Sequence, residues 1–574
     1  MNGRQFQVVI VMLLVLLMLS TVVVVAKEPR PSGVNGEWAV AEKKRTGPTV
    51  GLDTPVVFDT VITVTSSADP DDKDGRVCYR DDIPTKIPMA PCTLRRALVE
   101  ASALSDLEPS AEPILIKFNI PLADDGYDNA LGVWTIELFD TTDLYALPRM
   151  EGDQITVDGD TQGEIGGRTS GPKIIIRGPD GSQNGMPIDG DDNIIRGLGF
   201  QTLRTYLYLN GDGNVVEDNW FGLSDDGQDI HLRNELSPED GSGYTGVDFG
   251  AGLSGAMDNT VQDNVFAGFT GVAAAIKGRE NTFSGNYVGT VADGSVPLQG
   301  PFDQHPCRDD VWLGGSGISV ADRDHQIGGP NESDGNLFAG LYLELFEVST
   351  QPPAVRVSSG QGHLIQNNVI GLDGNDDVIG VCGRGLEFAT GPEGLDVISN
   401  TIVDPNLSAV VMNHWTLNGN TLRGNVIRRE GPWPAEQGDN TFPEDAIAYG
   451  DQVPDALKAF EPAVVTSIRG TTVNGVSGDS ENHQVCDDCV IEVFLEDTDT
   501  VTEALQSLAV VTADASGHWT ATLPAPLGTD ERVRTMSTVP DNWTIDDLDE
   551  GTTSNLSPLY PLFEVFLPVV FKAF

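Results

Sequence analysis

One phrase recurs through the middle of the chain and constrains its fold more than any other feature. It has the form Asn-x-apolar-x-x-Asn-x-apolar-Gly, with near-complete copies at residues 214–222, 259–267 and 281–289 and degenerate copies at 366–371, 397–403 and 420–427. A short unit that returns many times, with asparagine at its turns and β-branched residues between them, is typical of a solenoid.

Short apolar runs follow one another from residue 113 onward. The runs at 385–388 and 408–412 start 23 residues apart, which is the length that one three-sided parallel β-coil needs, and longer intervals indicate coils with inserted loops. Each coil would point its apolar side chains inward, stacked about 4.8 Å from those of the next coil. Asn and Gly suit the corners because they tolerate left-handed backbone, and stacked Asn side chains can bond from coil to coil. A propeller would be more regular, and a sandwich would need more hairpin turns.

The first residues predict export. Arg4 precedes an apolar run over 8–25 that ends in a small-residue cleavage pattern, so we interpret 1–26 as a signal peptide, with an uncleaved anchor as the alternative. A polar linker, 27–60, follows. Residues 61–112 then predict an N-terminal cap with a strand, an acidic loop and a helix. The apolar face of the predicted helix consists of Leu94, Ala97, Leu98, Ala101 and Leu104, and Thr93 is its N-cap.

The rest of the chain divides by pattern. The fold class expected is all-β: a right-handed parallel β-helix over 113–450, a linker over 451–463 and a small antiparallel β-sandwich over 464–557. The apolar tail, 558–574, is broken by proline and contains Glu564, so it predicts either a docked strand or a sorting signal rather than a spanning helix.

Six cysteines in an exported chain favour disulfides. We expect the pairs Cys78–Cys92 and Cys486–Cys489, and a third pair between Cys307 and Cys382, which each precede a strand-like segment. His483 with Cys486 and Cys489 could instead supply three zinc ligands, but an obvious fourth ligand is lacking.

The net charge of −52 bears on partners. Such a surface repels phosphate backbones, which argues against nucleic acid. The partner that we expect is a polysaccharide or a cell-envelope component, with a membrane involved only through the N-terminal signal or the C-terminal tail.

Several segments resemble one family of proteins. The cap segment CTLRRALVEAS, from Cys92, resembles the CSLREAI segment of exported bacterial right-handed parallel β-helix proteins, and GNYVGTVADG at 285–294 is similar to their GNYIGTDATG phrase. Residues 464–557 resemble an Ig-like module that often follows such helices. The resemblance implies a pectin-lyase-like fold and an extracellular or cell-surface location, but no particular reaction, because one fold hosts many activities.

Calcium is the best-supported cofactor candidate. Asp373, Asn375 and Asp377 alternate as oxygen donors, and Asp69 and Asp71 lie in an acidic loop, although Asp-rich turns also satisfy their own backbone. Asp225, Asp293 and Asp373 follow the glycine of three equivalent phrases and predict an acidic surface strip. The alternative is solvated loops.

Catalytic motifs of pectate lyases or polygalacturonases are missing from the sequence. Asp191 and Asp192 stand together, but there is no Gly-His-Gly, and His363 lacks partners. Trp220, Tyr287 and Trp415 could stack on sugar rings or simply pack. We therefore expect a surface protein that presents a lateral face for adhesion, carbohydrate binding or envelope structure. The alternative is a polysaccharide-active lyase or glycoside hydrolase.

Overall fold

The computed structural model describes residues 58, 60–70, 78, 91–107, 113–139, 143–163, 168, 170–179, 183–231, 245–250, 255–296, 315–341, 353–405, 407–413, 419–429, 446–477, 486–498, 502–540 and 551–560. The chain splits into the compact units Met1–Thr46 and Gly47–Phe574, and all described residues belong to the second. The signal peptide, Asp71, Cys307, His483, Trp415 and most of the tail lie outside the described residues. No helix within the described ranges is long and apolar enough to cross a membrane.

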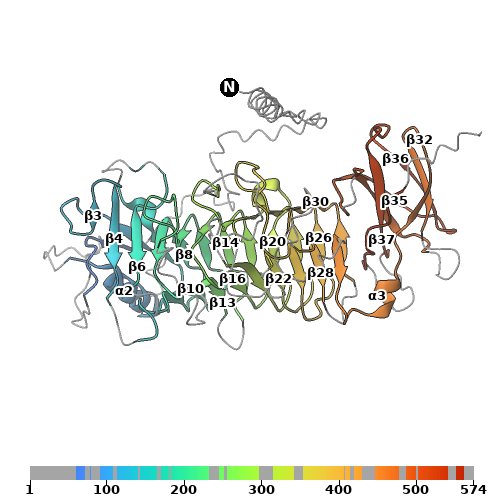
Figure 1. Ribbon diagram of the computed structural model, residues 1–574. Coiled ribbons are helices and arrows are strands. Elements are labelled where there is room, and N and C mark those ends of the chain that lie inside the picture. Colours follow the sequence, from blue (N-terminus) through green and yellow to red (C-terminus); the bar gives the residue numbers. More distant parts are fainter. Residues whose placement is uncertain are drawn as a thin grey trace, which may run out of the picture. The chain divides into compact units, whose positions relative to one another are not determined.

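Three long sheets wind around one interior, as a parallel β-helix requires (Figure 1). Sheet 1 consists of β1 (Thr60–Val64), β2 (Ile114–Phe118), β5 (Ile155–Asp158), β8 (Ile194–Arg196), β11 (Val215–Glu217), β14 (Thr260–Gln262), β17 (Thr282–Ser284), β20 (Gln326–Gly328), β23 (Leu364–Gln366), β26 (Asp396–Ile398) and β29 (Thr421–Arg423).

Sheet 2 follows sheet 1 in most coils. It consists of β3 (Tyr127–Asp128), β4 (Val133–Glu137), β6 (Ile174–Arg177), β9 (Leu198–Gln201), β12 (Trp220–Phe221), β15 (Val265–Phe266), β18 (Tyr287–Val288), β21 (Leu337–Phe338), β24 (Val369–Ile370), β27 (Thr401–Val403) and β30 (Val426–Arg428). Among the described strands of the three coil sheets, only β3 is antiparallel to its neighbour.

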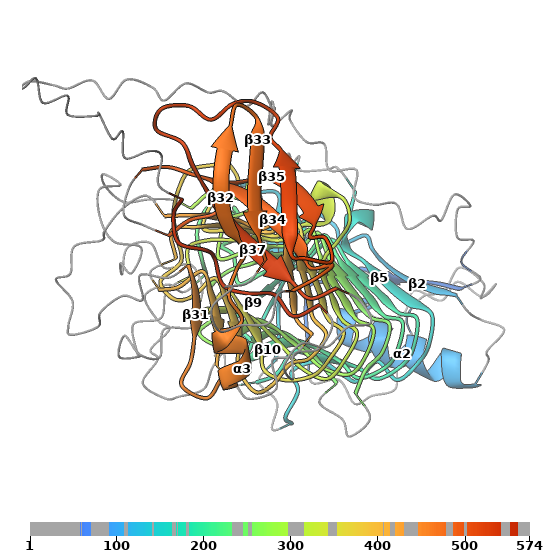
Figure 2. The same cartoon turned by 90° about the vertical axis from the view of Figure 1, so that its right-hand side faces the viewer.

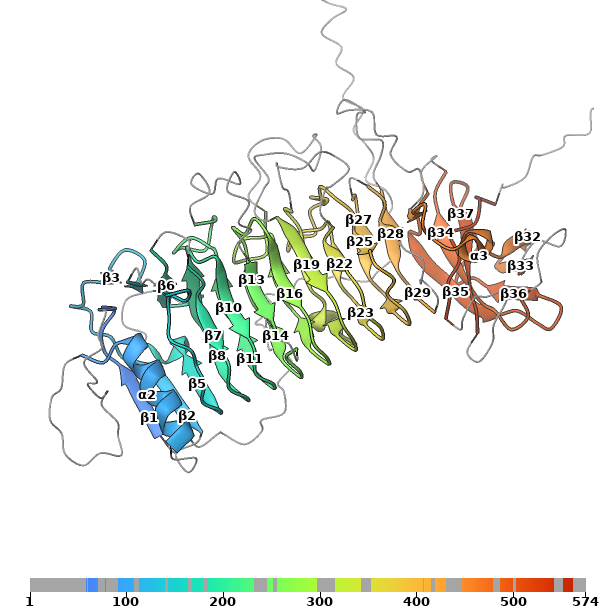
Figure 3. The same ribbon diagram turned by 90° about the horizontal axis from the view of Figure 1, so that it is seen from below.

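Sheet 3 forms the remaining side (Figure 3). It consists of β7 (Met186–Ile188), β10 (Thr205–Leu209), β13 (Thr245–Phe249), β16 (Val272–Ile276), β19 (Ser316–Val320), β22 (Val355–Val357), β25 (Leu386–Phe388), β28 (Val410–Met412) and β31 (Ile447–Tyr449). The predicted all-β fold class, with successive coils in parallel register, is confirmed.

The core consists of like residues stacked from coil to coil. Sheet 2 carries a stack of phenylalanines, in which the Phe200 and Phe221 rings lie 5.2 Å apart and the Phe221 and Phe266 rings 4.8 Å apart. All three side chains are fully buried. Burying a Phe contributes up to about 3 kcal/mol, so these stacks supply much of the stability.

Two columns of buried polar side chains occupy the corners that flank sheet 1. The column between sheets 1 and 2 is all asparagine, and each Oδ1 accepts the backbone N–H of the preceding column member: Asn219, Asn264, Asn286, Asn336, Asn368, Asn400 and Asn425. Left-handed backbone falls mainly on the residue just before the asparagine, such as Asp218, Asp263 or Gly285, rather than on the asparagine itself.

The column before sheet 1 changes residue type partway along. It runs through Asn193, Asn214, Asn259 and Asn281 and continues with two histidines. The Asn281 N–H donates to His325 Nδ1, and the His325 N–H donates to His363 Nδ1, both at 3.2 Å. Imidazole nitrogens thus replace amide oxygens as acceptors.

Helix α2 (Leu94–Leu107) packs against β1 and β2 at the first coil. Its buried face includes Leu94, Ala97, Leu98 and Ala101, and Thr93 Oγ1 accepts the Arg96 N–H at 3.4 Å, as an N-cap does. The short η2 (Gly159–Thr161), η4 (Glu332–Asp334) and α3 (Asp455–Ala459) are the other helical segments described.

Two three-stranded antiparallel sheets follow the β-helix (Figure 2). One has the order β32 (Val464–Arg469), β33 (Thr472–Val476), β36 (His518–Thr522), and the other β35 (Gln506–Thr512), β34 (Val490–Glu496), β37 (Arg532–Thr538). We call these sheets and their connections the C-terminal module. Its apolar interior is continuous with that of the coils.

The C-terminal module supplies partners to the backbone of the last coil. The N–H groups of Gly419 and Leu422 donate to hydroxyls of Thr552 and Thr553, at 2.8 and 3.0 Å. Further along, the Gly424 N–H donates to both oxygens of Glu492, at 3.1 and 3.0 Å. The Ile427 N–H bonds the Ala504 carbonyl, and the Arg429 N–H bonds Glu503. The module therefore covers the last coil of the stack, at the end opposite to α2.

Candidate functional site

Three polar side chains lie in register on the outer face of sheet 2. Glu137 pairs with Arg177, and Arg177 pairs with Gln201, at the last positions of β4, β6 and β9. Their neighbours Ile136, Ile176 and Phe200 point inward, so alternation along each strand turns these three outward. Arg177 Nη1 donates to Glu137 Oε1 at 2.7 Å, and Arg177 Nε donates to Gln201 Oε1 at 2.8 Å.

A loop after β12 adds a second carboxylate to this row. Asp225 accepts from Arg177 Nη2 at 2.9 and 3.0 Å and from Gln201 Nε2 at 2.7 Å. One guanidinium thus holds carboxylates from separate coils. We call Glu137, Arg177, Gln201 and Asp225 the Arg177 network. His231 lies near it, and burial, assisted by the positive charge of Arg177, lowers the pKa of its imidazole.

Arg168 and Trp220 hold the loop in place. The Arg168 guanidinium lies 4.6 Å from the centre of the Trp220 ring, and its Nη1 donates to the Asp225 carbonyl at 2.6 Å. Burial lowers the pKa of Arg168. A Cβ at Gly171 would lie 2.2 Å from Trp220 Cζ2, and one at Gly227 would lie 2.4 Å from Trp220 Cη2, so only glycine lets the backbone lie this close to the indole.

The row ends where loops cover the sheet. On the next two coils, the positions in register with Gln201 are the small residues Gly222 and Ala267. On the coil after these, a loop equivalent to the one after β12 begins at Gly289. The loops over them form a second apolar cluster outside the solenoid: Leu223, Ile230, Val265, Ala267, Val291, Val296, Ala339 and Ile379. Trp220 and Tyr287 pack against this cluster. Packing, rather than an open sugar-stacking platform, therefore accounts for both rings.

A second polar row runs along sheet 1 on the same coils. Asp158, Arg196, Glu217 and Gln262 are in register. Arg196 Nη2 lies 2.6 Å from Asp158, and Gln262 Nε2 donates to Glu217 at 2.9 Å. The nearby Asp160 has a raised pKa, caused first by burial and then by the negative charge of Asp158.

The loops predicted to form an acidic strip do stack, but their carboxylates differ in surroundings. The Ala292 N–H bonds the Gly227 carbonyl and the Gly374 N–H bonds the Gly294 carbonyl, which joins the three loops. Only Asp293 is exposed among the three aspartates; Asp225 is half-buried in the Arg177 network, and Asp373 is 4 % exposed. The three therefore do not form one solvent-facing strip, because loop folding uses two of the carboxylates internally.

The calcium candidates have protein partners. Asp373 accepts backbone N–H groups of Asn375, Asp377 and Val296, and burial raises its pKa. Asp69 is paired with Arg95, whose Nε and Nη2 lie 2.8 and 2.6 Å from its oxygens. Calcium binding at either loop stays a prediction that melting curves with a chelator can test.

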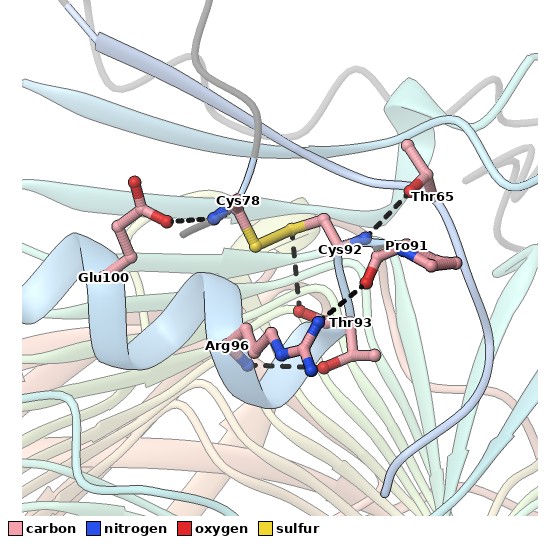
Figure 4. Close-up of a disulfide and its surroundings, with 7 residues drawn as sticks. All are labelled: Thr65, Cys78, Pro91, Cys92, Thr93, Arg96 and Glu100. Atoms are coloured by element: carbon pink, nitrogen blue, oxygen red, sulfur yellow. Dashed lines mark hydrogen bonds between the residues drawn. A yellow bond between two sulfur atoms is a disulfide. The ribbon is translucent and has the colours of Figure 1, made fainter. Parts of the chain in front are cut away.

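Two of the expected disulfides are present. Cys78–Cys92 joins the acidic loop to the start of α2, where the Cys92 N–H also donates to Thr65 and the Cys78 N–H to Glu100 (Figure 4). Cys486 and Cys489 form a disulfide in the C-terminal module, so their sulfur atoms are not the thiolates that a zinc site would need. Cys382 is also disulfide-bonded, and its expected partner Cys307 lies outside the described residues.

Sequence reasoning missed Glu137, Arg177 and Gln201. Each directly follows an apolar run, in WTIE, IIIR and LGFQ, and that repeated polar ending was the available signal.

No family model and no curated protein matches the chain. Among solved structures, it is similar to the tailspike protein of Escherichia coli bacteriophage HK620 in complex with a pentasaccharide, at 10% identity over 74% of this chain and 80% of that one, with a TM-score of 0.30.

Two further similar structures come from other proteins. An alginate lyase, AlyF-OU02, matches at 14% identity over 59% of this chain and 84% of that one, with a TM-score of 0.28. The A-module of the Azotobacter vinelandii mannuronan C-5 epimerase AlgE6 matches at 12% identity over 62% and 94%, with a TM-score of 0.29. These similarities concern the fold, which the strand pairing establishes independently.

Proposed function

We propose that this protein is exported and binds a polysaccharide through the Arg177 network. The observation that carries the proposal is that one guanidinium fixes Glu137 and Asp225, from separate coils, on the outer face of sheet 2. Salt bridges fix these groups before any ligand arrives, and a preorganised polar array loses little conformational entropy on binding.

The spacing of the array suits a chain-like ligand. Glu137 and Arg177 stand on adjacent strands, which repeat about every 4.8 Å, comparable to the length of a sugar ring, and the buried Gln201 on the next strand holds Arg177 in place. The Asp158–Arg196–Glu217 row on sheet 1 stands on some of the same coils and could extend the contact area.

Export is supported by the leader-like first residues and by the cysteines. Disulfides persist in oxidising compartments, and the structure has them at both ends of the described chain. An extracellular or cell-surface location is therefore part of this proposal, with an envelope component as a possible source of the polysaccharide.

The test is affinity electrophoresis of the full chain in gels that contain single polysaccharides. Glu137→Ala removes one outer arm of the Arg177 network, and its side chain is 62% exposed, so the fold should tolerate the change. Asp248→Ala is the matched control, because Asp248 forms a similar outward ion pair with Lys277, but on sheet 3. We expect retardation to weaken in Glu137→Ala and to persist in Asp248→Ala. Equal mobility changes in both variants would contradict this site.

A polysaccharide-cleaving enzyme is the second candidate function. The observation in its favour is Asp160, which lies close to Asp158 and whose surroundings raise the pKa of its carboxyl group, the direction that suits a general acid. Incubation with acidic and neutral polysaccharides, followed by assays for reducing and unsaturated ends, tests it. Products that vanish in Asp160→Asn would establish cleavage.

A further inference from the structure

Donor groups in the Arg177 network are already engaged. All three nitrogens of Arg177 donate to side chains within the network, to Glu137, Gln201 and Asp225. The amide nitrogen of Gln201 donates to Asp225 and to the Leu223 carbonyl, both at 2.7 Å. Positive charge is therefore present at this surface, but its hydrogen bonds point into the protein.

Arg168 is likewise engaged. Its Nε donates to the Ser170 carbonyl at 2.8 Å, its Nη1 donates to the Asp225 carbonyl at 2.6 Å, and its planar face covers Trp220. Two of the three Arg168 nitrogens therefore donate to backbone carbonyls, and Nη2 has no hydrogen bond assigned among the described residues.

Acceptor groups remain available to a ligand. A carboxylate offers about four acceptor positions. Glu137 is 62% exposed, and within the described residues only its Oε1 has an assigned hydrogen bond. Asp226, next to Asp225, is exposed, and hydrogen bonds from the Ser224 hydroxyl and the Gln228 N–H lower its pKa, so it stays ionised.

The charge balance agrees with this bonding pattern. Three carboxylates (Glu137, Asp225 and Asp226) face two guanidinium groups (Arg168 and Arg177). The whole chain adds a net charge of −52. An acidic polymer would approach a surface of its own sign, and most of the arginine donors that could bind its carboxylates already bond within the protein.

We propose that the Arg177 network selects glycans that donate hydrogen bonds and carry no acid groups, and that it rejects polyuronates. The inference rests on the proposed function and names the ligand class for that site. Sugar hydroxyls and amino-sugar ammonium groups share the required chemistry, because both donate to carboxylate oxygens.

The experiment compares three gels that contain dextran, soluble chitosan oligosaccharide or polygalacturonate, each with EDTA to exclude cation bridging. We expect retardation by dextran or chitosan and none by polygalacturonate. Salt separates the two sources, since binding through ammonium groups weakens as ionic strength rises and binding through hydroxyls does not. Retardation by polygalacturonate would overturn the inference.

A charge-reversal variant at Glu137 provides a second test of the ligand class. Glu137→Lys replaces the exposed acceptor with a donor, so we expect at least about a tenfold loss of affinity for the retarding glycan, the scale of one lost hydrogen bond to a charged group. Polygalacturonate binding should rise in this variant. Asp248→Lys on sheet 3 should change neither affinity, and melting curves would confirm that both variants are folded.

The outcomes separate the two proposals. If no gel retards the protein, or if Glu137→Lys and Asp248→Lys behave alike, the proposed binding site itself fails. If the protein binds polygalacturonate and Glu137→Lys strengthens that binding, the site stands and only the inferred ligand class is wrong.

Discussion

The imidazole rings of His325 and His363 stack 5.1 Å apart and within 6° of parallel, in a corner column whose preceding members are asparagines. His325 Nδ1 accepts a backbone N–H, and its Nε2 lies 2.7 Å from the Ala321 carbonyl. This pattern requires the neutral ring with its proton on Nε2, because a protonated Nδ1 could not accept.

This arrangement predicts a loss of stability in mild acid. Burial, with a further contribution from the charge of His363, lowers the pKa of His325 from 6.5 to about 4, while Asp322 and Asp324 act in the opposite direction. Between pH 6.5 and about 4, the His325 imidazole is protonated in the unfolded chain but not in the folded chain. The free energy of unfolding therefore falls as the pH drops through this range. The shift corresponds to about 3 kcal/mol. Denaturant unfolding at several pH values measures it.

The control for acid sensitivity is His325→Asn, which restores the residue type of the column. An amide oxygen can accept the Asn281 N–H, so the variant should lose much of the pH slope. The carboxyl group of Glu492, whose folded pKa is raised by burial, contributes with the opposite sign and is common to both proteins. An unchanged slope in His325→Asn would contradict the assignment.

The asparagine column predicts a large cost for a single truncation. Asn264 is fully buried; its Nδ2 donates to the carbonyls of Val216 and Gln262, and its Oδ1 accepts the Asn219 N–H. Asn264→Ala would leave these groups unpaired, at about 1–3 kcal/mol each, so we expect a loss of at least about 3 kcal/mol. The exposed Asn375→Ala should change the free energy of unfolding by less than about 0.5 kcal/mol. Urea denaturation of both variants gives the comparison.

Glu492 anchors the C-terminal module to the last coil, and its removal should weaken that contact. Glu492 accepts the Gly424 N–H and the Ser507 hydroxyl while only 5% exposed. Glu492→Ala leaves both donors buried, so we expect a loss of about 2–4 kcal/mol and faster hydrogen exchange at Gly424. Glu531→Ala, which removes an exposed carboxylate of the same module, should leave exchange at Gly424 as it was.

The disulfide of the N-terminal cap predicts a redox effect on stability. Cys78 and Cys92 are 14 residues apart in sequence, and closing a loop of that length stabilises a fold by about 3 kcal/mol in the chain-entropy model. Adding dithiothreitol should lower the melting temperature of the wild type. The Cys78→Ser/Cys92→Ser double variant should melt lower from the start and show a smaller further decrease.

How far the sequence predicts this structure depends on whether a feature repeats locally. The corner asparagines could be found because each, like Asn264 or Asn286, stands in the same short phrase as its own apolar neighbours. His363 was noticed only as a catalytic candidate, since nothing local shows that its ring continues a column begun by Asn281.

The candidate site was harder to predict because it depends on register between distant segments. Glu137 and Arg177 lie 40 residues apart in sequence, and the strands β7 to β12 lie between Arg177 and Asp225. Similarly, the alternation of apolar and polar residues in the C-terminal module indicated a sandwich. It gave no sign that Glu492 and Thr553 would accept backbone N–H groups of the last coil.

The bonds that the last coil makes to Thr552, Thr553 and Glu492 also determine how many copies of the chain can join. A bare final rung would offer a ready template for strand addition by a second molecule, and filaments could grow from it without limit. Because the polypeptide covers that rung with its own later residues, those backbone groups are not open to strand addition by a second molecule.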